Sequence, residues 1–163
     1  LADLIALAKR SPGKLSYGTP GSGSPHHLIG EQIKQLAGIF IVHVPYRGIG
    51  PALTDLQGGT IDIVVSTLAA LTPLVSAGRL KVLAIAESKR FDDAPNVPTV
   101  AETFPGFEAS AWLALYAPAG TPADVIRRLN EAVNTALTTN DVRARFWPAP
   151  LFRRLVPPRL WAP

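Results

Sequence analysis

The apolar residues along the chain alternate between the spacing of a helix and the short, β-branched runs of a buried strand. We expect helices to begin near Leu1, Pro25, Pro51, after Ser66 or Thr67, and near Thr99, Thr121 and Asn140. The expected strands are Leu15–Gly18, Ile39–Tyr46, Ile61–Val65, Leu80–Ala86 and Ala111–Ala117. Strands that alternate with helices in this way are typical of βαβ units.

This alternation predicts an α/β fold, a three-layer sandwich with a mostly parallel sheet and helices on both faces. The strands agree, because a strand that is buried on both faces has few polar residues. We expect residues 1–146 to form one domain. Residues 147–163 are rich in Pro, Trp and Arg and show no period, so we expect an irregular or non-native tail or a frameshifted end.

Local signals mark where several helices start. Ser24 is predicted to be an N-cap, with Pro25 at the first helical position. Thr121 and Asp124 have the spacing of a capping box at the start of a long amphipathic helix. Gly58 and Gly59 are expected to end the helix that begins at Pro51.

Composition narrows the class of protein. Hydrophobic residues make up 47% and charged residues 17% of the 163 residues, which is typical of a globular domain. No apolar run reaches the roughly 18–20 residues of a membrane-spanning helix, and the lack of cysteine excludes disulfides and thiolate sites. The sequence begins at Leu1 with no recognisable signal peptide, so we expect a processed chain or a piece of a longer one.

The net charge of +4 favours acidic partners, either a carboxylate ligand or nucleic acid. Five arginines lie beyond Asp141, however, and residues 1–140 carry equal numbers of basic and acidic residues. The basic residues are also not interleaved with aromatic residues on one element. A basic module that binds nucleic acid or a protein partner is therefore the alternative interpretation, and we expect no nucleic acid.

In the predicted fold, three strand ends lead into helix starts, at 18–25, 47–51 and 65–68. All three lie at one edge of an open parallel sheet, where ligands bind. Helix starts offer unpaired N–H groups and a positive dipole end, and glycines let a ligand approach. Such an edge suits a small anion, most simply a carboxylate. The expected binding residues are Thr19, Gly21, Ser22, Gly23, Ser24, His26, Arg47, Gly48, Ser66 and Thr67.

The residue types at these junctions also have an ordinary structural use. Gly, Ser and Pro cap helices and form turns in most folds, so the junctions alone fit either interpretation. Arg47 likewise has two open roles, as a bidentate clamp on a carboxylate or as the partner of a neighbouring acid.

No catalytic or cofactor motif accompanies this edge. The sequence has no G-x-S-x-G, no G-x-G-x-x-G and no phosphate-loop Gly-Lys-Ser/Thr, and no paired carboxylates lie near the glycine loops. Side chains of His26 and His27, adjacent on a helix, point about 100° apart, which disfavours a shared metal ion. We therefore expect a binding module and not an enzyme, with no metal and no cofactor.

Several long motifs, in the right order, resemble the Bug family, the solute receptors of tripartite tricarboxylate transport systems. The longest are YGTPGSGSPHHL at 17–28, HVPYRG at 43–48 and PALTDL at 51–56. AGRL at 77–80, VPTVAE at 97–102 and APAGTP at 117–122 follow in register. The resemblance covers about residues 1–146.

The resemblance implies a type II periplasmic binding-protein fold, in which two α/β domains close on a small carboxylic acid. This chain would supply the second domain, with ligand contacts from Thr19–His26, Arg47–Gly50 and Ser66–Thr67. A periplasmic location and membrane transporter components as partners are also implied. Members often have Asp-Asn where this chain has Ser66 and Thr67, a departure that leaves the identity of the carboxylate open.

A domain that lacks its partner exposes an apolar face, so we predict that this chain self-associates as a homodimer. Analytical ultracentrifugation of the 163-residue chain over a range of concentrations measures this directly. A shift towards the dimer mass at high concentration is expected, and a monomer at every concentration would contradict it.

Overall fold

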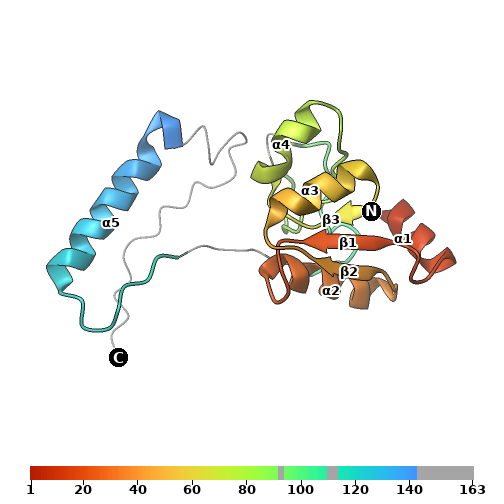
Figure 1. Ribbon diagram of the computed structural model, residues 1–163, viewed down its shortest axis with the longest axis horizontal. Helices are drawn as coiled ribbons and strands as arrows, with labels where there is room; N and C mark the ends of the chain where they lie inside the picture. Colours follow the sequence, from red (N-terminus) through yellow and green to blue (C-terminus); the bar gives the residue numbers. More distant parts are fainter. Residues whose placement is uncertain (92–93, 110–113, 143–163) are drawn as a thin grey trace. The chain divides into compact units, whose positions relative to one another are not determined.

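The computed structural model describes residues 1–91, 94–109 and 114–142 (Figure 1). The chain divides into two compact units, Leu1–Ala111 and Trp112–Pro163. The predicted domain boundary at residue 146 lies outside the described residues and stays a prediction. The first unit contains α1 (Ala2–Arg10), β1 (Ser16–Thr19), α2 (Pro25–Ala37), β2 (Val42–Pro45), α3 (Ile49–Gly58), β3 (Ile63–Val64) and α4 (Leu68–Ser76). The second contains α5 (Ala123–Thr138).

β1 is the central strand of a three-stranded sheet with the order β2-β1-β3 (Figure 1). Both neighbours run parallel to it, and Tyr17 pairs with His43 of β2 and with Ile63 of β3. Parallel neighbours need crossover connections, which α2 and α3 supply. Because the three strands run in the same direction, their carboxyl ends meet at one edge of the sheet.

Helices cover both faces of β1. Tyr17 is buried against α2, where a Cβ on Gly30 would overlap the Tyr17 ring. The next residue, Gly18, faces the opposite side. A Cβ there would lie 3.1 Å from Tyr46, whose hydroxyl donates a 2.7 Å hydrogen bond to Asp55 of α3. The structure therefore confirms the predicted α/β sandwich with a parallel sheet between helices.

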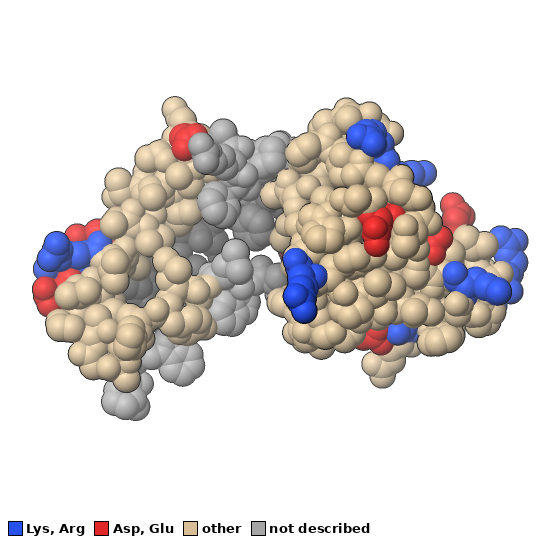
Figure 2. Space-filling model, viewed as in Figure 1, with Lys and Arg blue, Asp and Glu red and all other residues tan. Residues whose placement is uncertain are grey.

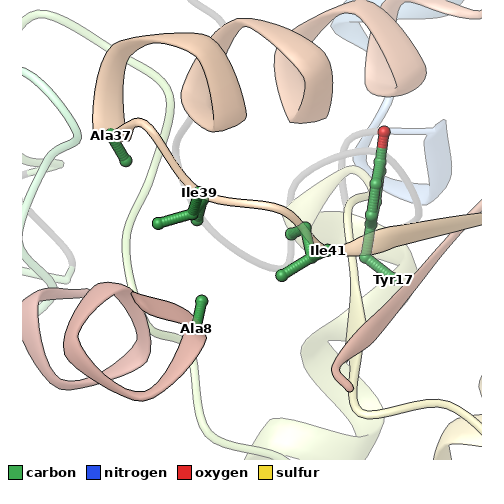
Figure 3. Packing of buried hydrophobic residues seen from close by; sticks show 5 residues of the cluster. All are labelled: Ala8, Tyr17, Ala37, Ile39 and Ile41. Atoms are coloured by element: carbon green, nitrogen blue, oxygen red, sulfur yellow. The ribbon is translucent and has the colours of Figure 1, made fainter. Parts of the chain in front are cut away.

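The main core cluster joins α1 and α2 to the segment that enters β2. Figure 3 shows its members, which are Ala8 of α1, Tyr17 of β1, Ala37 at the end of α2, and Ile39 and Ile41. All five are at most 9% exposed. The two alanines let the helices approach the isoleucine side chains closely, and this packing fixes where β2 begins beside β1.

Two of the five predicted strands need correction. The prediction of a strand at Leu80–Ala86 is wrong, because only a single bridge between Ile85 and Thr99 forms there. A β-branched run becomes a strand only where a partner backbone extends the ladder, and here the pairing stops at one residue. Of the predicted strand Ala111–Ala117, residues 114–117 are irregular, and residues 111–113 lie outside the described part.

Three predicted helix starts also need correction. α3 begins at Ile49 and not at Pro51, because Gly48 turns the chain earlier (φ 100°). The segment at Thr99 makes the reciprocal hydrogen bonds of a capping box with Glu102, but Pro105 and Gly106 (φ 85°) end it after one turn.

The predicted capping box at Thr121 is wrong, although the long helix that follows it is confirmed as α5. The Thr121 hydroxyl donates to the Pro118 carbonyl at 2.7 Å, so it serves the preceding turn, and Pro122 is the N-cap. Of the helix predicted to start at Asn140, residues 140–142 are helical, and the remainder lies outside the described residues.

The contact between α2 and β1 leads to a stability prediction. Gly30→Ala would force a methyl group into the Tyr17 ring, and we expect it to lower the free energy of unfolding by about 1–3 kcal/mol. Gly58→Ala is the matched control, because its Cβ would meet only Thr60, at 3.9 Å. It should be neutral or stabilising by up to about 1 kcal/mol. Urea denaturation measures both, and equal effects would contradict the packing described.

Candidate functional site

The three predicted junctions lie together at the carboxyl edge of the sheet. Tyr46 N–H donates to the Thr19 carbonyl at 3.0 Å, and Val65 N–H donates to the Gly18 carbonyl at 3.0 Å. Gly48 N–H donates to the Pro20 carbonyl at 3.1 Å. The loops after β2 and β3 are therefore hydrogen-bonded to the end of β1, which places the three helix starts side by side.

The first junction, Thr19–Ser24, is held by its own side chains. Ser24 is the N-cap of α2, as predicted, and its hydroxyl accepts from His27 N–H at 3.3 Å. The same hydroxyl donates to the Gly21 carbonyl at 2.7 Å. Within the part of the chain that the structure describes, the Ser22 amide has no acceptor. Ser22 is exposed, so this loop presents one free backbone donor to solvent.

The second and third junctions add a cation and two hydroxyls. Arg47 is exposed, and no carboxylate among the described residues forms an ion pair with it. Arg47 had two open roles, as a clamp on a ligand carboxylate or as the partner of a neighbouring acid, and the missing ion pair favours the first. Thr67 is the N-cap of α4, but its side chain makes no capping hydrogen bond. The exposed Thr67 and half-buried Ser66 thus keep hydroxyls that are not used by the helix start.

Thr19 departs from the expected picture of an exposed donor. Its side chain is fully buried, and its hydroxyl lies 2.7 Å from His43 Nε2 and 3.2 Å from the Gly21 carbonyl. His43 in turn stacks on His27, with ring centroids 3.9 Å apart and planes inclined by 13°. His27 Nδ1 accepts from Gly23 N–H at 3.0 Å. Two imidazoles therefore support the loop from below.

A charged group lies beside this imidazole pair. The Tyr17 hydroxyl donates to Glu31 at 2.5 Å, and Lys34 donates to both Glu31 oxygens at 2.7 and 2.8 Å. Burial would raise the pKa of the Glu31 carboxyl, but the hydrogen bonds from Lys34 and Tyr17 outweigh it and lower that pKa. Burial and the bond to Glu31 raise the pKa of the Tyr17 phenol. Glu31 is therefore ionised and neutralised locally.

The sequence did not reveal this network. It depends on the register that sets Tyr17 beside His43 across two strands, with their ring centroids 4.9 Å apart. The one available signal was the position of His43 within a predicted strand, four residues before Arg47 of a predicted ligand loop.

His26, one of the expected binding residues, is half-buried at the start of α2. Burial lowers the pKa of its imidazole, so the side chain is neutral at neutral pH. It has no hydrogen-bond partner among the described residues, and its role stays a prediction. No group of three His, Asp or Glu side chains in the described ranges is arranged to hold a metal ion.

Charge and hydropathy add two observations. On the face shown in Figure 2, Lys and Arg side chains are scattered and interspersed with Asp and Glu, so no continuous basic stripe is seen there. Among the helices in the described residues, none has the length and apolar character needed to cross a membrane.

A parallel α/β unit that brings glycine- and hydroxyl-rich helix starts to one sheet edge belongs to the class of folds in which small ligands bind at that edge. Within that class, the chain belongs to the tripartite tricarboxylate transporter family receptors, whose sequence profile matches residues 1–146. It is 38% identical over 144 residues to BugT of Bordetella pertussis (strain Tohama I), covering 88% of this chain and 44% of BugT.

Solved structures agree with the sequence match. R. palustris Rpa4515 with adipate is similar at 36% identity and a TM-score of 0.80, over 90% of this chain and 50% of that one. MatC (Rpa3494) from Rhodopseudomonas palustris with bound malate is similar at 32% identity and a TM-score of 0.79, over 89% and 50% of the two chains. The present chain thus spans about half the length of the relatives that it matches.

The cap of α2 gives a second stability prediction. Ser24→Ala removes the acceptor for His27 N–H and the donor to Gly21, so we expect a loss of about 1 kcal/mol in the free energy of unfolding. Thr67→Ala, at an N-cap that makes no side-chain bond, is the control and should cost less than about 0.5 kcal/mol. Thermal and urea unfolding compare the two. A Thr67 effect as large as that of Ser24 would contradict the stabilising role assigned to the Ser24 hydrogen bonds.

Proposed function

We propose that this chain is part of a periplasmic receptor that captures a small carboxylate and delivers it to a membrane transporter. The observation that carries the proposal is the sheet edge where the three junctions meet, in a family with similar structures that hold adipate and malate. The chain acts by binding and not as an enzyme, and it requires no cofactor. Neither the edge nor the relatives favour a nucleic-acid-binding module.

The residues of this edge have distinct roles in the proposed site. The exposed guanidinium of Arg47 pairs with a ligand carboxylate in a bidentate manner. The Ser22 amide and the hydroxyls of Ser66 and Thr67 are neutral donors to the same or a second carboxylate. Gly21, Gly23 and Gly48 leave the backbone open to the ligand, and neutral His26 forms a polar wall without adding charge.

Ser66 and Thr67 influence which acid is accepted. Two hydroxyls at this junction donate to a carboxylate without the repulsion that an acidic side chain would add. We therefore infer a preference for small dicarboxylates over amino acids, whose ammonium group would need a carboxylate partner here. No acidic residue lies among the ten proposed binding residues.

A single domain gives an incomplete enclosure. The relatives are about twice as long, and closure over a ligand excludes water from its polar contacts and strengthens them. We propose that this chain alone binds weakly and that its other exposed surface promotes self-association. On α2 and the segment that follows it, the most exposed large apolar side chains are Leu28 and Phe40, at 60% and 59%.

The binding role of Arg47 is tested in a full-length protein reconstructed on the pattern of the relatives. We expect Arg47→Gln to weaken binding of a dicarboxylate such as adipate or malate about ten- to a hundredfold, since it removes a charge-assisted hydrogen bond. Arg79→Gln is the matched control, because it removes the same charge beyond the carboxyl end of α4, away from the sheet edge. Isothermal titration calorimetry gives both affinities.

The class of ligand is tested with a panel of mono-, di- and tricarboxylates and amino acids. A rise in unfolding temperature with at least one di- or tricarboxylate is expected. No shift with any member of the panel, in a protein that unfolds cooperatively, would contradict the proposed function.

A further inference from the structure

The stacked imidazoles beneath the first junction have a use that the binding residues themselves do not explain. His27 comes from α2 and His43 from β2, and each makes one hydrogen bond to the same loop. His27 Nδ1 accepts from Gly23 N–H at 3.0 Å, and His43 Nε2 lies 2.7 Å from the Thr19 hydroxyl. The loop is therefore held at both ends by a pair of rings in contact with each other.

The bond at Gly23 defines the protonation state of His27. An amide N–H can only donate, so Nδ1 of His27 must be unprotonated to accept from it. The ring is then neutral, with its proton on Nε2, which lies 3.8 Å from Glu31. A second proton, on Nδ1, would set two N–H donors against each other and break the bond to Gly23.

Gly23 lies in a turn closed by the hydrogen bond from Ser24 N–H to the Gly21 carbonyl, at 3.3 Å, and its own amide donates only to His27 among the described residues. It has a φ of 73°, it is exposed, and no atom lies within 4 Å of the place where a Cβ would be. The side chain of His27, at the third position of α2, reaches back to this amide much as the glutamate of a capping box does. The orientation of the Gly23 amide thus depends on this single acceptor, while Ser24 and Thr19 hold the neighbouring Gly21 carbonyl.

The groups around the pair restrict its charge. Tyr17 of β1 lies beside His43, while Glu31 of α2 faces His27 and is held by Tyr17 and Lys34. Burial, followed by repulsion from His27, lowers the pKa of His43. The hydrogen bond from Gly23 N–H is the contact that a second proton on His27 would break, because that proton would occupy Nδ1.

We propose that His27 is a positioning residue of the binding edge, which holds the Thr19–Ser24 loop in its binding conformation only while the imidazole is neutral. Ligand affinity then falls when acid adds a second proton to this ring. This inference rests on the proposed function, since it assigns a pH dependence to the same site.

The loop is tested first without ligand, by NMR on the 163-residue chain. In the unmodified chain, the Gly23 amide resonance is expected to move with pH at the same midpoint as the His27 ring. In His27→Asn, whose Oδ1 stands where Nδ1 was, the amide should stay constant. In His27→Phe, which keeps the stacking but has no acceptor, it should be displaced at every pH. A Gly23 resonance that ignores pH, or that titrates equally in His27→Asn, would overturn the proposal.

The effect on binding is tested by titrating adipate and malate into the same three proteins at about pH 8 and pH 5. In His27→Asn, the change in affinity between the two pH values reports the ionisation of the ligand itself. Between about pH 8 and pH 5, the affinity of the unmodified chain should fall about three- to tenfold more than that of His27→Asn. His27→Phe should bind more weakly than the unmodified chain at both pH values, by a similar factor that corresponds to one hydrogen bond. Unfolding temperatures verify that each variant is folded. If His27→Phe does not fold, the comparison of the unmodified chain with His27→Asn is sufficient.

The outcomes separate the two proposals. Binding with the same pH dependence in the unmodified chain and in His27→Asn would overturn the role of His27 and leave the receptor function intact. If the Gly23 amide resonance and the His27 ring change with pH at the same midpoint, but neither acid binds at any pH, the result would support the positioning role and contradict the carboxylate site.

Discussion

The parallel pairing of β1 with both of its neighbours is the constraint on which the rest of the site depends. Ser16–Thr19 pair with β2 on one side, and Tyr17 and Gly18 pair with β3 on the other, so all three strands end at one edge. If either neighbour ran antiparallel, its following helix would start at the opposite edge. Arg47 and Thr67 would then lie far from the loop at Thr19, and no shared site could exist.

The polar groups beneath this edge are buried or half-buried, and the buried ones have hydrogen-bond partners. Among the described residues, no buried side-chain oxygen or nitrogen lacks a partner. An apolar pair in place of Thr19 and His43 would fill the same space at less cost of desolvation, but it would not hold a loop in one conformation. The network therefore links the packing of β1 and β2 to the shape of the surface above them.

What the sequence could predict was local. Ser24 followed by Pro25 predicts the start of α2, and Gly59 predicts the end of α3, because capping depends on a few adjacent residues. The alternation of elements predicted the class of fold and the edge where the junctions meet. The strand expected at Leu80–Ala86 failed because strand formation depends on a partner that is distant in sequence. The imidazole pair was missed for the same reason, since it depends on the register between β1 and β2.

The most direct test of the central claim, that a carboxylate binds at this edge, is to map the amide resonances that move when adipate or malate is added to the isotopically labelled chain. The account predicts that the shifts concentrate at Ser22, Gly23, Gly48 and Ser66, on the three junctions. Shifts confined to the opposite end of the sheet, around Gly38 and Gly59, or absent throughout at saturating ligand, would contradict it.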